Sequence, residues 1–190
     1  MFKYKFDEEG YLLKYKARIC VRGDLQHTTE ETHAATLAVK IFRALMAIAT
    51  YFNLEIRQYD AVNAFTNSKL ERRVYCYTPE GFDEPDYVWE LRRALYGLKT
   101  SPRLWYKDLT LSLKKFGLTL VPNVPCLYKN DKAIVFFYVD DIIMMATPGN
   151  NSALDELESK LCKRYEITKL GNLGTFISIT VQRDRALGQI

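Results

Sequence analysis

Two adjacent aspartates, Asp140 and Asp141, interrupt a run at residues 133–146 that contains no other charged side chain. A run this apolar predicts a buried strand on either side of the acids. An unpaired carboxylate in such surroundings is strongly disfavoured by desolvation, and two adjacent carboxylates repel each other. One of them should therefore take up a proton unless a cation joins the pair. A divalent metal ion that prefers oxygen ligands, such as Mg²⁺, is the simplest solution.

Length and composition predict a folded chain with a substantial core. The 190 residues are 48% hydrophobic and 13% aromatic, which excludes a disordered chain. The net charge of +4 and the pI near 8.8 are compatible with a polyanionic partner without demanding one. The four cysteines are scattered without a CxxC pair, so we expect reduced thiols and no zinc site.

The ends and apolar runs of the chain give no targeting signal. The first residues, Met-Phe-Lys-Tyr-Lys-Phe, alternate in charge and do not form the apolar segment of a signal peptide. The longest apolar run is divided by the two acids and is too short to span a bilayer. We therefore expect an intracellular protein, cytoplasmic or nuclear, that does not enter a membrane. The residues do not indicate an oligomeric state.

Strands and helices are mixed along the chain without strict strand–helix–strand alternation, which favours an α+β fold over a doubly wound sheet. No repeat or low-complexity linker separates independent domains. Strands are predicted at residues 2–6, 14–21, 54–60, 74–77, 87–91, 126–129, 133–139, 142–146 and 175–183. Helices are predicted at 37–52, at 104–116 with a helix start at Ser101-Pro-Arg, and at 153–165.

The two acids are expected at the tip of a hairpin, with the apolar strands on either side filling the core. Adjacent strand residues point to opposite faces, so only one acid of the pair can serve a site squarely. Asp60, at the end of another predicted strand, could supply the partner carboxylate. Carboxylates from neighbouring strands that hold a metal pair suit in-line phosphoryl transfer. On the residues alone, this interpretation and that of an ordinary Asp-Asp turn are evenly balanced.

Several sequence blocks, in this order along the chain, resemble one known family. The segment Tyr138-Val-Asp-Asp141 resembles the active-site box of reverse transcriptases, and four further blocks lie at residues 16–23, 58–65, 74–82 and 95–106. Together they resemble the polymerase of copia-type long-terminal-repeat retrotransposons. The resemblance extends from about residue 2 to residue 183.

The resemblance implies a reverse-transcriptase-like arrangement of fingers and palm, with a palm of ferredoxin-like topology and an antiparallel sheet. Residues 1–55 and 61–105 would be rich in fingers elements, and residues 54–60 and 106–190 in palm elements. Thumb, ribonuclease H and integrase regions would be absent from residues 1–190. The implied activity is RNA-directed DNA polymerisation, in which deoxynucleotides are added to a DNA primer on an RNA template.

The family's functional residues match positions of this sequence. Asp60, Asp140 and Asp141 match the catalytic acids, which would bind two Mg²⁺ ions (or Mn²⁺ as a substitute) together with the backbone carbonyl of Ala61. Phe65 matches an aromatic that packs under the incoming sugar and excludes a 2′-hydroxyl, although ordinary core packing explains it equally well. Tyr96 and Gly97 match a segment that lines the nucleotide pocket.

Two groups of cations are candidates for binding phosphates. Lys16, Arg18 and Arg22 are expected on one face of a strand, suited to a triphosphate, or else on an ordinary exposed face. A second group is interleaved with aromatic residues and contains no acid, as a nucleic-acid groove requires, although a solvated helix face is the alternative. Its members are Arg92, Arg93, Lys99, Arg103 and Lys107.

Two features weigh against full activity. The segment Phe176-Ile-Ser-Ile179 lacks the glycine usual in the family, and the region is expected to help hold the primer end. A polymerase without a thumb would hold its primer–template poorly, so we expect a chain limited to these residues to be weak or inactive. The alternatives to an active polymerase are an inactive element remnant and a non-catalytic nucleic-acid-binding module.

Overall fold

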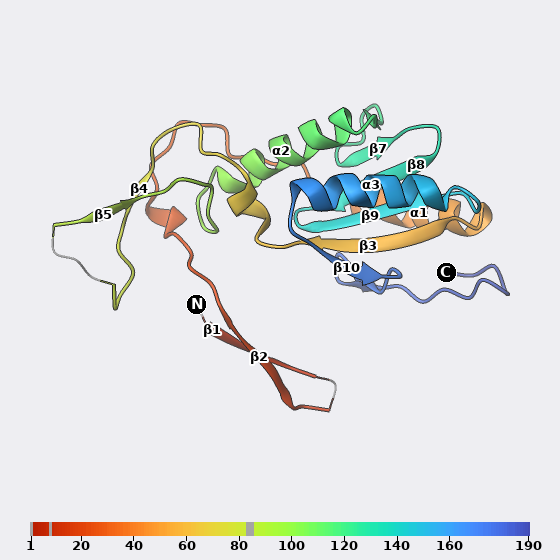
Figure 1. Cartoon of the computed structure of the whole chain (residues 1–190), viewed down its shortest axis with the longest axis horizontal. Coiled ribbons are helices and arrows are strands. Elements are labelled where there is room, and N and C mark those ends of the chain that lie inside the picture. Colours follow the sequence, from red (N-terminus) through yellow and green to blue (C-terminus); the bar gives the residue numbers. More distant parts are fainter. Residues whose placement is uncertain (1, 8, 83–85) are drawn as a thin grey trace.

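A six-stranded antiparallel sheet forms the body of the protein in a computed structural model that describes residues 2–7, 9–82 and 86–190 (Figure 1). The strand order across this sheet is β10-β3-β9-β8-β7-β6. Its strands are β3 (Glu55–Ala61), β6 (Thr119–Leu120), β7 (Leu127–Lys129), β8 (Ala133–Tyr138), β9 (Asp141–Ala146) and β10 (Ile167–Gly171).

Helices cover both faces of the sheet. They are α1 (Val39–Tyr51), α2 (Ser101–Lys115) and α3 (Asn151–Arg164). Adjacent side chains of β8 point to opposite faces of the sheet. Phe136 packs against Phe42 of α1 on one face, and Phe137 packs against Tyr106 of α2 on the other. Helix α3 shares the α2 face, where Glu158 accepts a 2.7 Å hydrogen bond from the Tyr59 hydroxyl. With both faces covered, β8 carries no charged side chain and β9 carries only Asp141.

Two small hairpins extend from the body, as Figure 1 shows. One pairs β1 (Phe2–Phe6) with β2 (Leu12–Ala17), and the other pairs β4 (Tyr75–Tyr77) with β5 (Val88–Glu90). Short 3₁₀ helices, η1 (Gly23–Leu25) and η2 (Ala64–Asn67), lie in the connections. None of the helices in the described part of the chain is long and apolar enough to cross a membrane.

The mixed helices and antiparallel sheets predicted from the sequence are confirmed. All three predicted helices are present, with bounds shifted by at most three residues, and the strands that flank the acids are present as well. The single strand predicted at residues 175–183 is wrong. Two short strands, β11 (Thr175–Phe176) and β12 (Ile179–Thr180), form a hairpin there. The sequence analysis also missed β10, an edge strand that pairs with β3.

The turn of the β11–β12 hairpin contains Ser178, the position at which the resemblance predicts a glycine. Ile177 and Ser178 have φ angles of +50° and +59°, and these two residues connect the paired residues Phe176 and Ile179. A two-residue hairpin turn with positive φ at both positions is of the type that favours glycine or asparagine. Ser178 is therefore held in a conformation that disfavours a side chain.

Replacing Ser178 by glycine is expected to stabilise the protein by up to about 1 kcal/mol, because removal of the Cβ relieves the left-handed strain. In a protein of this size the melting temperature should then rise by about 2–4 °C. Ser178→Ala, which keeps the Cβ, should give no gain. A lower melting temperature for Ser178→Gly than for the unchanged protein would contradict the assignment of strain to this turn.

Candidate active site

Two of the three predicted acids are placed opposite each other by the pairing of β3 with β9. Asp60 is the cross-strand partner of Asp141, at the end of the sheet where β8 and β9 are connected. Directly opposed residues of antiparallel strands share a face, so both side chains lie on the face that α1 covers in part. Both residues are partly exposed. Like charges in this position destabilise a sheet unless something neutralises them.

Asp140 lies in the turn between β8 and β9, and this turn begins one residue earlier than the sequence predicted. The sequence analysis put the turn at Asp140 and Asp141, but Tyr138 pairs with Asp141, so the turn consists of Val139 and Asp140. Val139 has φ +54°, and a positive φ at the first turn position alone belongs to a turn that usually carries glycine there. The Asp140 carbonyl accepts a hydrogen bond from the Ala61 N–H (2.9 Å), which attaches the turn to β3.

The acids influence one another electrostatically. Burial raises the pKa of Asp60, and the negative charge of Asp140 raises it further. Burial likewise raises the pKa of Asp141, with smaller contributions from the charges of Asp140 and Asp60, while a hydrogen bond from Gln58 opposes the rise. The three carboxylates thus form one interacting group that is less stable when fully ionised.

The donor chemistry of this group fits a hard divalent cation, which prefers carboxylate oxygens and would cancel the mutual repulsion. The side chains as they stand do not converge on one point. Within residues 2–7, 9–82 and 86–190, no group of three or more His, Cys, Asp or Glu side chains lies close enough together to hold a metal ion. Binding would therefore require the carboxylates to rotate toward each other.

A face of four lysines belongs to the hairpin of β1 and β2. Lys3 pairs with Lys16 and Lys5 with Lys14, so these four side chains share one face, here called the lysine face. Burial lowers the pKa of Lys16, and the charges of Arg18 and Lys5 lower it further, whereas Asp60 raises it. The sequence analysis proposed Lys16 and missed the other three, although the Lys-Tyr-Lys alternation in residues 3–5 was visible.

Arg22 does not belong to this face. The prediction placed it with Lys16 and Arg18 by strand alternation, but β2 ends at Ala17. Arg22 instead forms a 2.7 Å ion pair with Asp24, and both side chains are well exposed. Arg18 lies just beyond the strand, with its guanidinium 5.2 Å from the centre of the Tyr96 ring. The prediction that three cations share one strand face is therefore wrong for Arg22, which lies outside the strand.

Phe65 and Tyr96, both predicted to be in the nucleotide pocket, are in contact. Their ring centres are 4.5 Å apart, and Phe65 is buried whereas Tyr96 is partly exposed. Burial raises the pKa of Tyr96, and the charges of Asp140 and Asp60 also contribute to the rise. The tyrosine therefore lies within electrostatic reach of the acids and connects Phe65 to them.

Gly97 is required by the packing of the chain against itself. It has φ +93°, and a Cβ at this position would lie 2.0 Å from the carbonyl oxygen of Val21. Gly23 is equally constrained, because a Cβ there would lie 1.8 Å from the Gly97 oxygen. The Val21 N–H donates to the Tyr96 carbonyl at 2.8 Å. Gly97 is thus needed for the close approach of residues 21–23, which attach the β1–β2 hairpin beside Tyr96.

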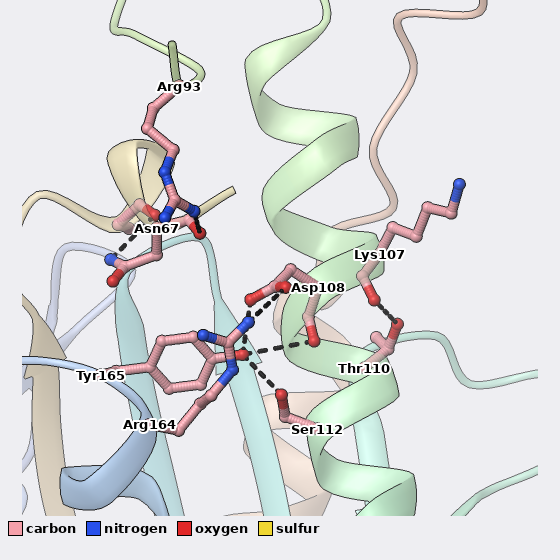
Figure 2. Close-up of polar contacts among 9 residues, drawn as sticks. Asn67, Arg93, Lys107, Asp108, Thr110, Ser112, Arg164 and Tyr165 are labelled. Atoms are coloured by element: carbon pink, nitrogen blue, oxygen red, sulfur yellow. Dashed lines mark hydrogen bonds and ion pairs between the residues drawn. The ribbon is translucent and has the colours of Figure 1, made fainter. Parts of the chain in front are cut away.

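The predicted basic segment is largely engaged within the protein. Lys107 and Arg103 form ion pairs with Glu71, and Arg103 also pairs with Glu31. The Arg93 guanidinium donates to the Asn67 carbonyl at 3.1 Å, as Figure 2 shows. Lys99 donates to the Gln26 carbonyl, and Arg92 is exposed. Acids from residues distant in sequence therefore neutralise part of a segment that contains no acid itself.

Gln58 is a further residue of the site that sequence analysis missed. It is buried, lies on the same face of β3 as Asp60, and donates its amide to the Thr175 carbonyl at 2.8 Å. Its amide oxygen accepts a hydrogen bond from the Gly174 N–H (3.1 Å). Gln58 thereby fixes the β11 segment next to Asp141. The signal available in the sequence was the spacing of two residues between this glutamine and Asp60, which places both side chains on the same face of a strand.

Comparison with known proteins identifies the class of the chain. The family model described as reverse transcriptase (RNA-dependent DNA polymerase) matches residues 1–190. The chain therefore belongs to the reverse transcriptase family, and its relatives are the Pol polyproteins of copia-type elements, as the sequence blocks predicted.

Three relatives illustrate the match. The Retrovirus-related Pol polyprotein from transposon TNT 1-94 of Nicotiana tabacum is 29% identical over 97% of this chain and 15% of its own length. That from transposon RE1 of Arabidopsis thaliana is 33% identical over 96% of this chain and 13% of its own length. The Truncated transposon Ty1-A Gag-Pol polyprotein of Saccharomyces cerevisiae is 30% identical over 92% and 14%. The chain thus spans about one-seventh of the length of these relatives.

Proposed function

We propose that this chain forms the fingers and palm of an RNA-directed DNA polymerase that adds deoxynucleotides to a primer 3′-hydroxyl. The six-stranded sheet with its helices would be the palm, of ferredoxin-like topology, and the two projecting hairpins would belong to the fingers. The observation that carries the proposal is the placement of Asp60 opposite Asp141, with Asp140 in the adjoining turn, in a member of the reverse transcriptase family.

In this proposal Asp60 and Asp140 are the main ligands of two Mg²⁺ ions, supported by Asp141 and the backbone carbonyl of Ala61. When bound, the ions would activate the primer hydroxyl and neutralise the leaving pyrophosphate. The acids themselves hold a concentrated negative charge that draws cations to the end of the sheet. The support is their mutual repulsion, which raises the pKa of Asp60 and Asp141 and which a divalent cation would remove.

The lysine face would bind the triphosphate of the incoming nucleotide and the adjacent template backbone. Lys16, Lys5 and Arg18 lie close enough to the acids for their charges to lower the pKa of Asp60. Cations beside a metal site favour a polyphosphate that bridges the two. RNA template and DNA primer would then lie across the open part of the sheet face between this hairpin and the acids.

Primer extension tests the proposal. The purified chain is incubated with a labelled DNA primer on an RNA template, deoxynucleotides and Mg²⁺, and the products are separated by length. We expect weak extension, because residues 1–190 are expected to lack the thumb that holds the primer–template, and this extension should require Mg²⁺ and all four nucleotides. No extension, together with no Mg²⁺-dependent change in melting temperature, would contradict the proposal and favour an inactive remnant.

A second candidate function, nucleic-acid binding without catalysis, is favoured by the lysine face alone. Four lysines in directly opposed pairs destabilise a hairpin unless an anion lies between them. RNA affinity that falls steeply with salt and is unchanged when Asp60, Asp140 and Asp141 are all replaced by asparagine would support this function, provided that extension is absent.

Replacing Phe65 by valine is expected to reduce the preference for deoxynucleotides over ribonucleotides by at least about tenfold, because a smaller side chain leaves room for a 2′-hydroxyl. The preference is measured as the ratio of kcat/KM for dCTP and CTP on one primer–template. Phe82→Val is the control, since Phe82 is 66% exposed, lies between β4 and β5 and is not among the residues proposed to bind the nucleotide. An active Phe65→Val protein with unchanged preference would refute a gating role for Phe65.

A further inference from the structure

The carbonyl of the strained turn residue has a buried hydrogen-bond donor that belongs to a helix. Trp105 of α2 is 1% exposed, and its indole Nε1–H donates to the Val139 carbonyl at 2.6 Å. Val139 is the residue with φ +54° that precedes Asp140. A β-branched residue is disfavoured in this conformation, so the turn persists only where its surroundings hold it.

Together with β3, this contact fixes the backbone on both sides of Asp140. The peptide group before Asp140 is held through the Val139 carbonyl by Trp105, and the one after it through the Asp140 carbonyl by the Ala61 N–H (2.9 Å). Fixing both peptide planes fixes the direction of the Asp140 Cα–Cβ bond. The carboxylate then retains only its own side-chain rotations.

Trp105 is itself held by a network between α2 and the end of α3. The Tyr165 ring packs edge-on against the indole with centres 5.2 Å apart. Its hydroxyl lies 2.7 Å from Asp108 Oδ2 and 2.7 Å from Ser112 Oγ, and Arg164 pairs with Asp108 at 2.9 Å, as Figure 2 shows. Two helices thus support the indole in one orientation, and through it the turn.

We propose that Trp105 is a positioning residue that holds Asp140 by its hydrogen bond to the Val139 carbonyl. The effect of Trp105 on metal binding rests on the proposed function, because it requires Asp140 to be a metal ligand. The role of Trp105 in holding the turn does not depend on that function. An ordinary core tryptophan would contribute packing alone, so the two roles separate when the hydrogen bond and the strain are changed independently.

The first test is metal-free hydrogen exchange of the Ala61 amide, whose acceptor is the Asp140 carbonyl. Trp105→Phe, which keeps an aromatic ring but removes the N–H, should accelerate this exchange about tenfold. Amides of β3 and β9 far from the turn, such as that of Met145, should exchange as before. Adding Val139→Gly, which accepts positive φ freely, should restore most of the protection. Unchanged Ala61 exchange in Trp105→Phe, or no restoration by glycine, would overturn the proposal.

The second test follows the two indole N–H signals by NMR, which the two tryptophans of the chain make simple to assign. In the unchanged protein, Mn²⁺ should broaden the Trp105 signal and leave that of Trp89, in the β4–β5 hairpin, sharp. Trp105→Phe should weaken Mn²⁺ binding about tenfold, and Trp89→Phe should not.

The two tests separate failure of this inference from failure of the proposed function. If the unchanged protein binds no Mn²⁺, the metal site is refuted, and the exchange of the Ala61 amide still decides whether Trp105 holds the turn. If Mn²⁺ binds equally well to Trp105→Phe and to the unchanged protein, the positioning role is overturned while the metal site stands.

Discussion

Replacing Asp140 by asparagine is expected to reduce primer extension by about a thousandfold or more. Asparagine has the same shape but no charge, so it cannot neutralise a divalent cation as a carboxylate does. Several kcal/mol of transition-state stabilisation depend on that charge, and each 1.36 kcal/mol corresponds to about tenfold in rate. Extension rates are measured at saturating nucleotide and Mg²⁺. A variant that keeps more than about a tenth of the activity would refute the proposed role of Asp140.

The same substitution should leave the metal-free protein at least as stable as before. The charge of Asp140 raises the pKa of Asp60 and of Asp141. Because these folded-state pKa values lie above the unfolded values, folding is progressively disfavoured as the pH rises from about 4 through the raised pKa values. At neutral pH the repulsion is fully present, and Asp140→Asn reduces it.

The control for charge removal is Asp131→Asn. Asp131 is exposed in the loop between β7 and β8, at the end of β8 opposite to the acids. The Asp131→Asn substitution should change neither extension nor the dependence of melting temperature on Mg²⁺. If Asp140→Asn lowers the melting temperature of the metal-free protein by more than Asp131→Asn does, a structural role of Asp140 would explain the lost activity instead.

The sheet core was predictable because local pattern and tertiary structure agree there. Apart from the two acids, residues 133–146 are uncharged because both faces of β8 and β9 are covered. Strand pairing then places the residues on either side of a two-residue turn opposite each other. The turn was placed one residue too late because Val139 has a left-handed backbone that its β-branched side chain disfavours. The local propensity of valine favours an extended strand at this position instead of a turn.

The parts of the site that depend on long-range contacts were not predictable. Strand β10 is mostly exposed and exists through its pairing with β3, in which Ile167 pairs with Ala61, 106 positions earlier (167 minus 61). The Trp105 donor meets an acceptor 34 positions away. No periodicity encodes such a partner. The apolar run, the predicted strand ends and the family resemblance made Asp60 and Asp140 candidates, and none of them contained information about what holds these residues in place.

Replacing Phe136 by alanine is expected to destabilise the protein by about 3–5 kcal/mol, as large-to-small substitutions of buried aromatics do. Phe136 is fully buried in β8, with its ring centre 6.2 Å from that of Phe42 in α1 and 5.5 Å from that of Phe176 in β11. The cavity would therefore loosen three elements at once. Urea unfolding followed by circular dichroism measures the loss, and the melting temperature should fall by about 10 °C.

The matched control is Phe82→Ala, which removes an aromatic that is 66% exposed and should change stability by about 0.5 kcal/mol or less. A loss below about 1 kcal/mol for Phe136→Ala would contradict the packing of α1 and β11 against this face of the sheet. The face matters for function because Gln58, which borders Asp141, is bonded to the Thr175 carbonyl of β11. Loosening Phe176 should release that contact, so Mn²⁺ affinity is expected to fall in Phe136→Ala even under conditions in which the variant is fully folded.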